Sequence, residues 1–509
     1  MPISELHSTG DQVDVVIVGC GPTGATLALL LARFGVSALI LEREEAIYPL
    51  PRAVHFDDQI MRVFQSLGVA GPIARAARYN PGMRFVDPSG HLLLDWPRPA
   101  GVGENGWYTS YRFHQPDLES ILREQIDVTQ AANLLTNVEV TGVEQSDSQV
   151  NVIYKNRQTG AFASVNASYV VGCDGARSTV RKHINEAVDD LGFNEHWLVV
   201  DVLLHQEKPE LGDFTIQHCG RDRPATYVRC PADRRRWEIS LKPEDNADTI
   251  ARDDSIWKLL EQWLLPHEAT IERSAVYEFK SLVSRQWRDR RLFIAGDAAH
   301  LTPPFMGQGM CAGIRDVSNL SWKIAACCNS SGFSNDTHET LLDSYQSERV
   351  PNVKEYIETA IRLGALINSC DTQESLKRAF GGGEDTVRMK SIVPGLGVGL
   401  AAGNETYRGD WFPQPCLASG QRLDERVGLK AVLLITASLL ADYRQQYSSG
   451  DDIGLEIIIA DDEPEIVALL ARYEVAAVLV RPDRYLLGSA CKGGEVKLLI
   501  DAAKKFTSL

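Results

Sequence analysis

Apolar runs and glycines alternate at the start of the chain in the order of a strand, a turn, a helix and a second strand. The β-branched run Val15–Val18 has the length of a buried parallel strand. It is followed by the turn Gly19–Gly24, a helical pattern over Ala25–Phe34 and a second apolar run, Ala38–Leu41. This pattern predicts a βαβ unit beginning near residue 13.

The middle of the chain changes to a predominant alternation of apolar and polar positions, which is typical of half-buried strands. Between residues 190 and 285 the alternation recurs in HWLVVDVLL, DFTIQHC, ATYVRC, RRWEISL and SAVYEF. Shorter bursts within 80–107, MRFVD and HLLLDW, predict strands of the same sheet-rich domain. A buried strand at Arg291–Ala295 and long helical patterns through Cys328 and over Leu341–Cys370 follow.

The last part of the chain predicts a separate small α/β domain. From Gly428 onwards the pattern runs strand, helix, strand, helix, strand, strand, helix, and residues 371–425 before it show little regular pattern. The predicted organisation is a polar tail (1–12), a nucleotide-binding domain (13–79, 108–180 and 286–370), an inserted β-sheet domain (80–107 and 181–285), a connector (371–425) and a C-terminal domain (426–509).

Composition narrows the class of protein. A chain of 509 residues is too long for one core, and 44% hydrophobic and 24% charged residues are typical of a globular protein. The net charge of -16 argues against nucleic acid or an anionic membrane as a general partner. The chain shows no membrane-spanning run and no signal peptide, and its 10 cysteines include no CxxC pair, so we expect no metal site, reduced thiols and a cytoplasmic location.

Each glycine of the first turn has a distinct physical use in a dinucleotide site. Gly19 allows a sharp turn, Gly21 allows backbone to approach a pyrophosphate, and Gly24 allows helix and strand to pack closely. The start of the helix favours an anion through its unpaired N–H groups. Glu42, at the end of the second strand, can accept hydrogen bonds from a ribose hydroxyl. An ordinary glycine-bearing turn is the alternative interpretation.

Two later turns also follow apolar strands. Asp174-Gly175-Ala176-Arg177 comes after Ala167–Cys173, although an Asp-Gly pair is commonest as a plain turn. Gly296-Asp297 comes after Arg291–Ala295 and precedes the glycine pair of Gly307–Gly309 at a helix start. The carboxylate of Asp297 can bind sugar-chain hydroxyls, and the bare backbone N–H groups at 307–309 can meet an electron-rich ring edge or a phosphate.

Three stretches together, VIVGCGPTG, VVGCDGARSTVRK and RLFIAGDAAHLTPPFMGQGMCAGIRDVSNLSWKIA, resemble the FAD-dependent aromatic hydroxylases of the para-hydroxybenzoate hydroxylase fold. Within that group the chain is most similar to the 3-(3-hydroxyphenyl)propionate and phenol hydroxylases. The resemblance covers about residues 13–365. It implies an α/β fold, in which a Rossmann-like FAD-binding domain carries an inserted β-sheet substrate domain. The tail, with VLVRPDRYLLG, resembles a thioredoxin-like domain without CxxC, so packing or a homodimer contact is expected there.

The resemblance also implies roles for individual residues. Arg52 and Gln115 resemble side-chain contacts to the flavin or its linker, and Asp174 and Arg177 resemble a motif tied to both FAD and NAD(P)H. The other residues implied to bind FAD are Gly19, Gly21, Gly24, Glu42, Asp297, Gly307, Gln308 and Gly309. A single GxGxxG fits transient docking of NADH or NADPH without a second nucleotide domain.

The implied reaction is hydroxylation of a small phenolic or heteroaromatic ring by NAD(P)H and O2 through a flavin C4a-hydroperoxide. A base or hydrogen-bond relay near the phenol would make the ring more nucleophilic. His55 and Tyr227 are the catalytic candidates, although a capping or core histidine and a packed tyrosine are the ordinary interpretations. Pro304 and Phe305 are expected to shape the substrate pocket.

Several alternatives stay open at this point. His300 is expected to serve local structure, and Arg234–Arg236 could attract a carboxylate or form a solvated turn. The same flavin chemistry could carry out epoxidation or Baeyer-Villiger oxidation of a natural-product intermediate. A flavin-fold protein without catalysis is a third reading, which the intact Asp297 and Gly307–Gly309 argue against.

Overall fold

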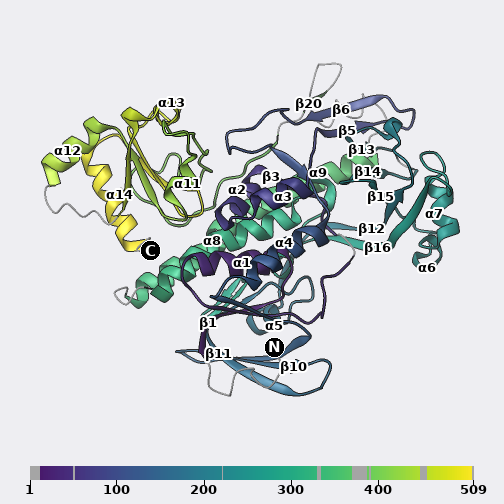
Figure 1. Cartoon of the computed structure of the whole chain (residues 1–509), viewed down its shortest axis with the longest axis horizontal. Coiled ribbons are helices and arrows are strands. Elements are labelled where there is room, and N and C mark those ends of the chain that lie inside the picture. The colour runs from purple at the N-terminus through teal and green to yellow at the C-terminus, as the bar shows by residue number, and fades with distance from the viewer. Residues whose placement is uncertain are drawn as a thin grey trace.

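The computed structural model describes residues 12–49, 52–220, 222–329, 334–369, 387–388, 391–447 and 455–506. Residues 1–11 of the predicted polar tail and part of the predicted connector, 370–386 and 389–390, lie outside this described part. Two large sheets form the body of the molecule, and a smaller sheet belongs to the C-terminal domain at one side (Figure 1).

The first sheet is parallel at its centre, in the order β18-β11-β1-β2-β8. Parallel strands end at the same edge of a sheet, so the turns after β1, β2, β11 and β18 meet there. Those turns carry the glycine motif, Glu42, Asp174 and Asp297. The strands are β1 (Gln12–Val18), β2 (Ala38–Leu41), β8 (Ala132–Leu135), β9 (Val138–Gln145), β10 (Val150–Asn156), β11 (Phe162–Gly172), β17 (Arg288–Asp289) and β18 (Leu292–Ile294).

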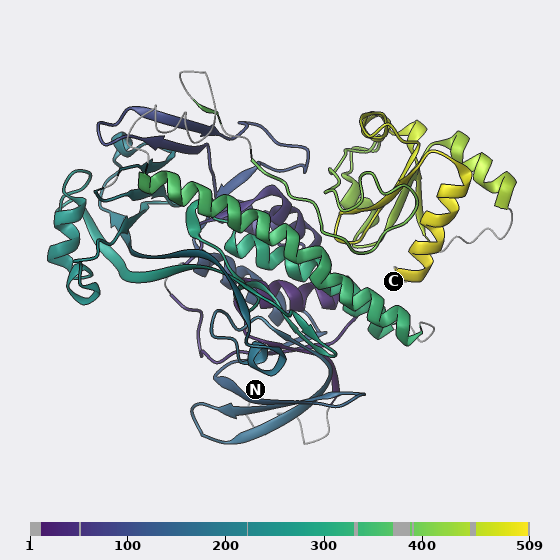
Figure 2. The same cartoon turned by 180° about the vertical axis from the view of Figure 1, so that it is seen from behind.

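Helices cover this sheet and extend beyond it. The buried helix α1 packs against α4 and α8, and the long α9 crosses the back of the molecule toward the C-terminal domain (Figure 2). The helices of this domain are α1 (Pro22–Arg33), α2 (Asp58–Leu67), α3 (Ala70–Ala76), α4 (Gln115–Asp127), α5 (Thr179–Ile184), α8 (Gly309–Asn329) and α9 (Asn335–Ser369).

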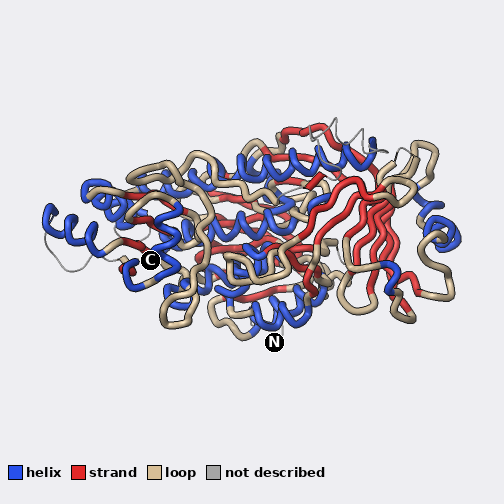
Figure 3. The backbone as a smooth tube through the Cα atoms, turned by 90° about the horizontal axis from the view of Figure 1, so that it is seen from above, coloured by secondary structure: helices blue, strands red, loops and turns tan. Residues whose placement is uncertain are grey.

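The second sheet takes strands from both segments of the predicted inserted domain, and it forms the curved wall of strands in Figure 3. Its outer face buries an apolar core under α6 (Ala247–Ile250) and α7 (Asp253–Leu260). Its inner face packs against the turn Pro304–Met306 and α9. In sheet order the strands are β19 (His300–Leu301), β16 (Ala269–Ser284), β12 (Val188–Leu204), β15 (Arg234–Ser240), β14 (Ala225–Arg229), β13 (Thr215–His218), β5 (Gly82–Val86), β6 (Leu92–Pro97) and β20 (Val387–Arg388).

A three-stranded sheet joins the two domains, in the order β3 (His55–Asp57), β7 (Ser110–Arg112) and β4 (Arg78–Tyr79). The buried Arg112 donates from Nη1 to Asp213 O at 2.6 Å and from Nη2 to Thr215 Oγ1 at 2.8 Å. Ser110–Arg112 pair as a strand, and α4 begins after them at Gln115.

The C-terminal domain has four strands in the order β22-β21-β23-β24. One parallel pair followed by two antiparallel pairings, with a helix after β21, after β22 and after β24, is the thioredoxin-like order. Its elements are α11 (Leu423–Val427), β21 (Val432–Ile435), α12 (Ala437–Tyr447), β22 (Glu456–Ile459), α13 (Pro464–Arg472), β23 (Ala477–Val480), β24 (Leu486–Ala490) and α14 (Gly493–Phe506). None of the helices described is long and apolar enough to cross a membrane.

Candidate cofactor and substrate site

The glycines of the β1–α1 turn differ in what a side chain would meet. At Gly24 an added Cβ would lie 2.0 Å from Gly19 O, so helix and strand are too close for any larger residue. Gly19 has φ +97°, and its Cβ would lie 2.6 Å from Cys173 O. At Gly21 an added Cβ would meet nothing within 4 Å. The backbone at Gly21 is therefore open to a ligand, while Gly19 and Gly24 are enclosed by packed backbone atoms.

Glu42 lies beside this turn. Its Oε2 accepts a hydrogen bond from Cys20 N at 2.7 Å, and its Oε1 accepts one from Glu44 N at 2.8 Å. A carboxylate has more acceptor sites than these two bonds use, so Glu42 can still receive a hydroxyl hydrogen.

The Gly296-Asp297 turn touches the β1–α1 turn and the helix α5 that follows the Asp174 turn. Gly296 has φ +62°, and its Cβ would lie 2.9 Å from Thr23 Oγ1 of the β1–α1 turn. Arg181 of α5 donates to Ala298 O at 2.8 Å. Asp297 is exposed at the edge of the sheet. Even so, partial desolvation by the surrounding protein raises the pKa of its carboxyl group. His300 and Arg52 act in the opposite direction.

Asp174 serves the local structure of its own turn. Its carboxylate accepts hydrogen bonds from Ser178 Oγ at 2.5 Å and Thr179 N at 2.6 Å, at the start of α5. Burial raises the pKa of Asp174, and these bonds oppose that effect. Arg177 projects from the same turn and is exposed.

The Gly307–Gly309 turn leads into α8 and packs on His55. Gly307 has φ +63°, and its Cβ would lie 2.8 Å from His55 Cβ. The side chain of Gln308 is buried. Its Nε2 donates to Asp57 Oδ2 at 3.2 Å, and its Oε1 accepts from Arg315 Nη1 at 3.0 Å. The Gln308 side chain is thus held by protein, and backbone forms the free surface of this turn.

Both ring nitrogens of His55 have partners. Nδ1 lies 3.2 Å from Gly307 O, which can only accept, so we assign the proton to Nδ1. Nε2 then accepts from Ser110 Oγ at 2.7 Å, and Ser110 in turn accepts from Asn80 Nδ2 at 2.9 Å. Burial lowers the pKa of His55 to about 4. The imidazole is therefore neutral near pH 7 and can take up a proton only through Ser110 or by a rearrangement.

The inner face of the second sheet packs against Phe305, which lies two residues before Gly307. Phe305 is buried and meets the ring of Trp197 edge to face, with ring centroids 5.4 Å apart. Three polar side chains pair across neighbouring strands on the same face, Gln217, Thr226 and Glu238. Burial raises the pKa of Glu238. Apolar rings and a few polar groups together are typical of a pocket for a small organic ligand.

Tyr227 does not lie on this inner face, which corrects the expectation from sequence. It lies on the outer face, where its ring packs on Trp237 with centroids 5.2 Å apart and its hydroxyl donates to Gly212 O at 3.4 Å. The solvated-turn reading of the arginine triplet is also wrong. Arg236 is buried on the inner face, donates to both oxygens of Asp201 and donates from Nη1 to Arg52 O at 2.8 Å.

A cavity of about 260 Å³ lies elsewhere, lined by residues that include Trp107, Tyr111 and Arg422. Tyr111 stands between Ser110 and Arg112 on β7, and neighbouring side chains of a strand point to opposite faces. Since Ser110 contacts His55, this cavity lies on the far side of β7 from His55.

Comparison with known proteins decides the family. Residues 12–360 match the FAD binding domain family, which is more than half of the chain. The probable NADH-specific resorcinol 4-hydroxylase of Rhodococcus jostii (strain RHA1) is 34% identical over 95% of this chain and 93% of that protein. A 3-(3-hydroxy-phenyl)propionate/3-hydroxycinnamic acid hydroxylase of Burkholderia cenocepacia (strain HI2424) is 30% identical over 95% of each.

The chain belongs to the FAD-dependent aromatic hydroxylases. The family expected from the sequence motifs is thereby confirmed. Solved structures share its fold over nearly the whole length. The flavin-dependent monooxygenase PieE in complex with FAD and substrate has a TM-score of 0.78 at 21% identity, covering 99% of this chain and 100% of that one. The anhydrotetracycline hydroxylase OxyS from Streptomyces rimosus has a TM-score of 0.74 at 21% identity, covering 98% and 100%.

The residues of this aromatic hydroxylase fit FAD at the edge of the first sheet. The open backbone at Gly21 lies at the start of α1, whose N-cap has no side-chain hydrogen bond. That end of the helix can therefore bind a pyrophosphate. Glu42 and Asp297 stand on either side with acceptor oxygens for sugar hydroxyls.

The guanidinium of Arg123 also lies at this edge, and it was not among the candidate site residues predicted from the sequence. Gln115, Glu119 and Arg123 follow each other at intervals of four residues on α4 and share one face. Gln115 Oε1 accepts from Arg52 N at 3.0 Å, and Arg123 Nη2 reaches Cys20 O at 3.4 Å. The four-residue spacing after Gln115 was the signal that would have indicated Arg123.

Proposed function

We propose that this chain uses NADH, bound FAD and O2 to hydroxylate a small monocyclic phenol of the resorcinol type. The observation that carries the proposal is the meeting of three motif turns at one sheet edge, with Phe305, two residues before Gly307, packed on the inner face of the second sheet, the face that carries Glu238. The near full-length similarity to an NADH-specific resorcinol hydroxylase supports the choice of NADH and of a one-ring substrate.

In this proposal each motif turn binds one part of FAD. The ADP half lies on Gly19, Gly21, Gly24, Glu42 and Arg123, where backbone N–H groups and a guanidinium face the pyrophosphate. Asp297 binds the sugar chain, and the backbone at Gly307 and Gly309 faces the flavin ring. Arg52, held by Gln115 and Arg236, lies beside the linker. The exposed Arg177 meets NADH during its transient docking.

Bound FAD supplies hydride acceptance and oxygen activation, and the protein has to orient the ring and exclude water. The apolar side chains of Pro304, Phe305 and Trp197 hold the ring and keep water out. Glu238 accepts the phenolic proton, because a carboxylate whose pKa is raised by burial is a stronger base than an exposed one. His55 is a second acceptor, reached through the hydroxyl of Ser110.

Substrate-stimulated oxidation of NADH by the yellow, FAD-loaded protein tests this function. We expect resorcinol or a related phenol to stimulate oxidation at least tenfold, with NADPH much less effective and about one hydroxylated product formed for each NADH. Hydrogen peroxide as the sole product would contradict the proposal. Product NMR separates ring hydroxylation from an epoxide or an ester, and a colourless protein that cannot take up FAD would support a non-catalytic role.

The cytoplasm is the proposed location, since NADH and reduced thiols are found there. A homodimer is also proposed, and sedimentation of the FAD-loaded protein tests it, with a monomer at micromolar concentration as the contrary result.

A further inference from the structure

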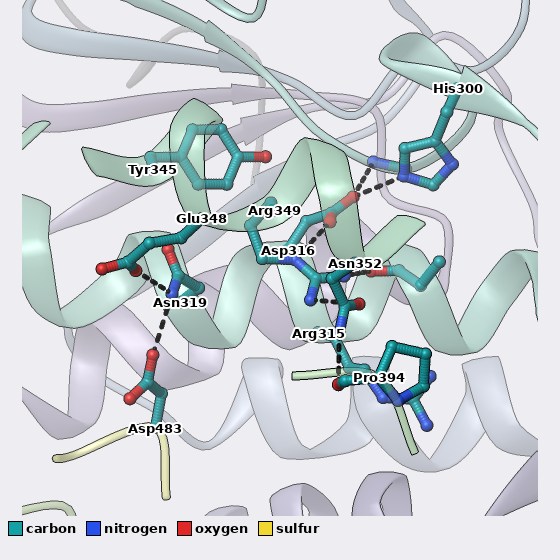
Figure 4. Close-up of polar contacts among 12 residues, drawn as sticks. His300, Arg315, Asp316, Asn319, Tyr345, Glu348, Arg349, Asn352, Pro394 and Asp483 are labelled. Atoms are coloured by element: carbon teal, nitrogen blue, oxygen red, sulfur yellow. Dashed lines mark hydrogen bonds and ion pairs between the residues drawn. The ribbon is translucent and has the colours of Figure 1, made fainter. Parts of the chain in front are cut away.

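The C-terminal domain contacts the FAD-binding domain through buried charges (Figure 4). Glu348 of α9 accepts two hydrogen bonds from Arg481, at 2.9 and 2.8 Å, and one from Lys323 Nζ at 2.7 Å. Asn319 of α8 donates to Glu348 at 2.9 Å and to Asp483 at 3.0 Å. All five side chains are at most 2% exposed. We call these residues the domain-contact cluster.

A second buried cluster lies beside it on the same two helices and holds the Gly296–Ala298 turn. Asp316 accepts from Arg349 Nε at 2.9 Å and from Gly296 N at 3.0 Å, and it lies 2.7 Å from His300 Nε2. His300 therefore serves local structure, as its position in the sequence suggested. Despite burial, His300 and Arg349 hold the pKa of Asp316 below its ordinary value. We call Asp316, Arg349 and His300 the turn cluster.

Each helix carries members of both clusters at adjacent positions. Glu348 and Arg349 are consecutive on α9, and Asp316 and Asn319 are three residues apart on α8, on one face of the helix. Buried charges are costly to leave unpaired, so α8 and α9 cannot slide past each other without disturbing both clusters. Arg481 and Gly296 are thus joined by a continuous series of contacts, from Arg481 to Glu348, along α9 to Arg349, and from Arg349 through Asp316 to Gly296 N.

We propose that Arg481 and Asp483 of the C-terminal domain act as positioning residues that hold the Gly296–Asp297 turn ready for FAD. Neither residue touches the site. They fix α8 against α9, and the helices fix Asp316, which fixes the backbone N–H of Gly296. The inference rests on the proposed placement of FAD at this turn, and its test includes a measurement without FAD.

The test compares two substitutions that break buried contacts between the same two domains. Arg481→Met removes the guanidinium and keeps much of the side-chain volume. Asp424→Asn is the matched control, because it weakens the buried ion pairs of Asp424 with Arg62 of α2 and with Arg484, and neither partner lies on α8 or α9. Hydrogen exchange of the segment 292–301 is measured by mass spectrometry in apoprotein, and the Kd for FAD is measured by flavin fluorescence.

We expect Arg481→Met to exchange at least tenfold faster in this segment and to bind FAD at least tenfold more weakly. Asp424→Asn should change both by less than twofold, and Arg481→Lys, which keeps a charge, should fall between. Should Arg481→Met fail to fold, Asn319→Ala carries the same test, since it removes the side chain that joins Glu348 to Asp483.

Unchanged exchange in both Arg481→Met and Asn319→Ala would overturn the proposal, as would equal effects in Asp424→Asn. Faster exchange with an unchanged Kd would instead overturn the placement of FAD at this turn, which separates this failure from that of the coupling.

Discussion

A pair of alanine substitutions in the β1–α1 turn separates packing from ligand binding. Both Gly21 and Gly24 belong to the same motif, but an added Cβ meets nothing within 4 Å at Gly21 and lies 2.0 Å from Gly19 O at Gly24. Gly21 has φ -72° and ψ -177°, which alanine adopts without strain. We therefore expect Gly21→Ala to fold like the parent and Gly24→Ala to be destabilised.

The magnitudes follow from these contacts. In Gly24→Ala helix and strand must separate by about 1 Å to reach the shortest tolerated contact, and overpacking of this kind costs about 1–3 kcal/mol. Gly21→Ala should change the free energy of unfolding by less than about 0.5 kcal/mol. Its methyl group displaces a phosphate from at least one backbone N–H, and a hydrogen bond to a charged group is worth about 1.5–3 kcal/mol, or roughly ten- to a hundredfold in Kd.

The assay is thermal unfolding of the two apoproteins, followed by titration with FAD and detection of flavin fluorescence. The expected result is a parent-like Tm with weak FAD binding for Gly21→Ala, and a Tm lowered by several degrees for Gly24→Ala. If Gly21→Ala bound FAD with the parent's Kd, the pyrophosphate would not lie at this turn and the assignment of the ADP half would be wrong.

Three further predictions concern the substrate side. Tyr227→Phe loses one long hydrogen bond on the outer face, so kcat and KM should stay within twofold. A tenfold fall in kcat would contradict the position of Tyr227 outside the substrate site. Glu238→Gln should lower kcat at least about tenfold and remove the rise of kcat with pH, while FAD content, read from the flavin absorbance, stays normal. The pKa of His55 falls from 6.5 to about 4 on folding, so the unfolded chain binds this proton more readily between those values. Its contribution to stability is complete above pH 6.5 and is lost by up to about 3 kcal/mol as the pH falls toward 4. His55→Gln should therefore flatten the plot of Tm against pH in that window, and an unchanged slope would contradict a neutral imidazole in the folded protein.

Local patterns were sufficient to predict the nucleotide-binding unit. Gly19, Gly21 and Gly24 have different environments, and their spacing alone indicated three different uses because each depends only on the adjoining strand and helix. The parallel order of β1, β2, β11 and β18 then explains why motifs far apart in sequence meet at one edge.

The face of a strand could not be predicted in the same way. Alternation shows that Tyr227 points opposite to Thr226, but it does not tell which face meets the FAD-binding domain. The packing of α6 and α7 decides that, and it leaves Tyr227 outside and Glu238 inside. The contact between Glu348 and Arg481 is equally non-local, since 133 residues separate them and neither lies in a pattern that indicates the other.

Oxygen labelling tests the central claim most directly. The FAD-loaded protein is supplied with NADH, a phenol that stimulates NADH oxidation and ¹⁸O₂, and the product is analysed by mass spectrometry. The account predicts that the ring gains one hydroxyl group carrying a single ¹⁸O atom from O2. A product whose new oxygen comes from water, or NADH oxidation that ends wholly in hydrogen peroxide with every phenol tried, would contradict it.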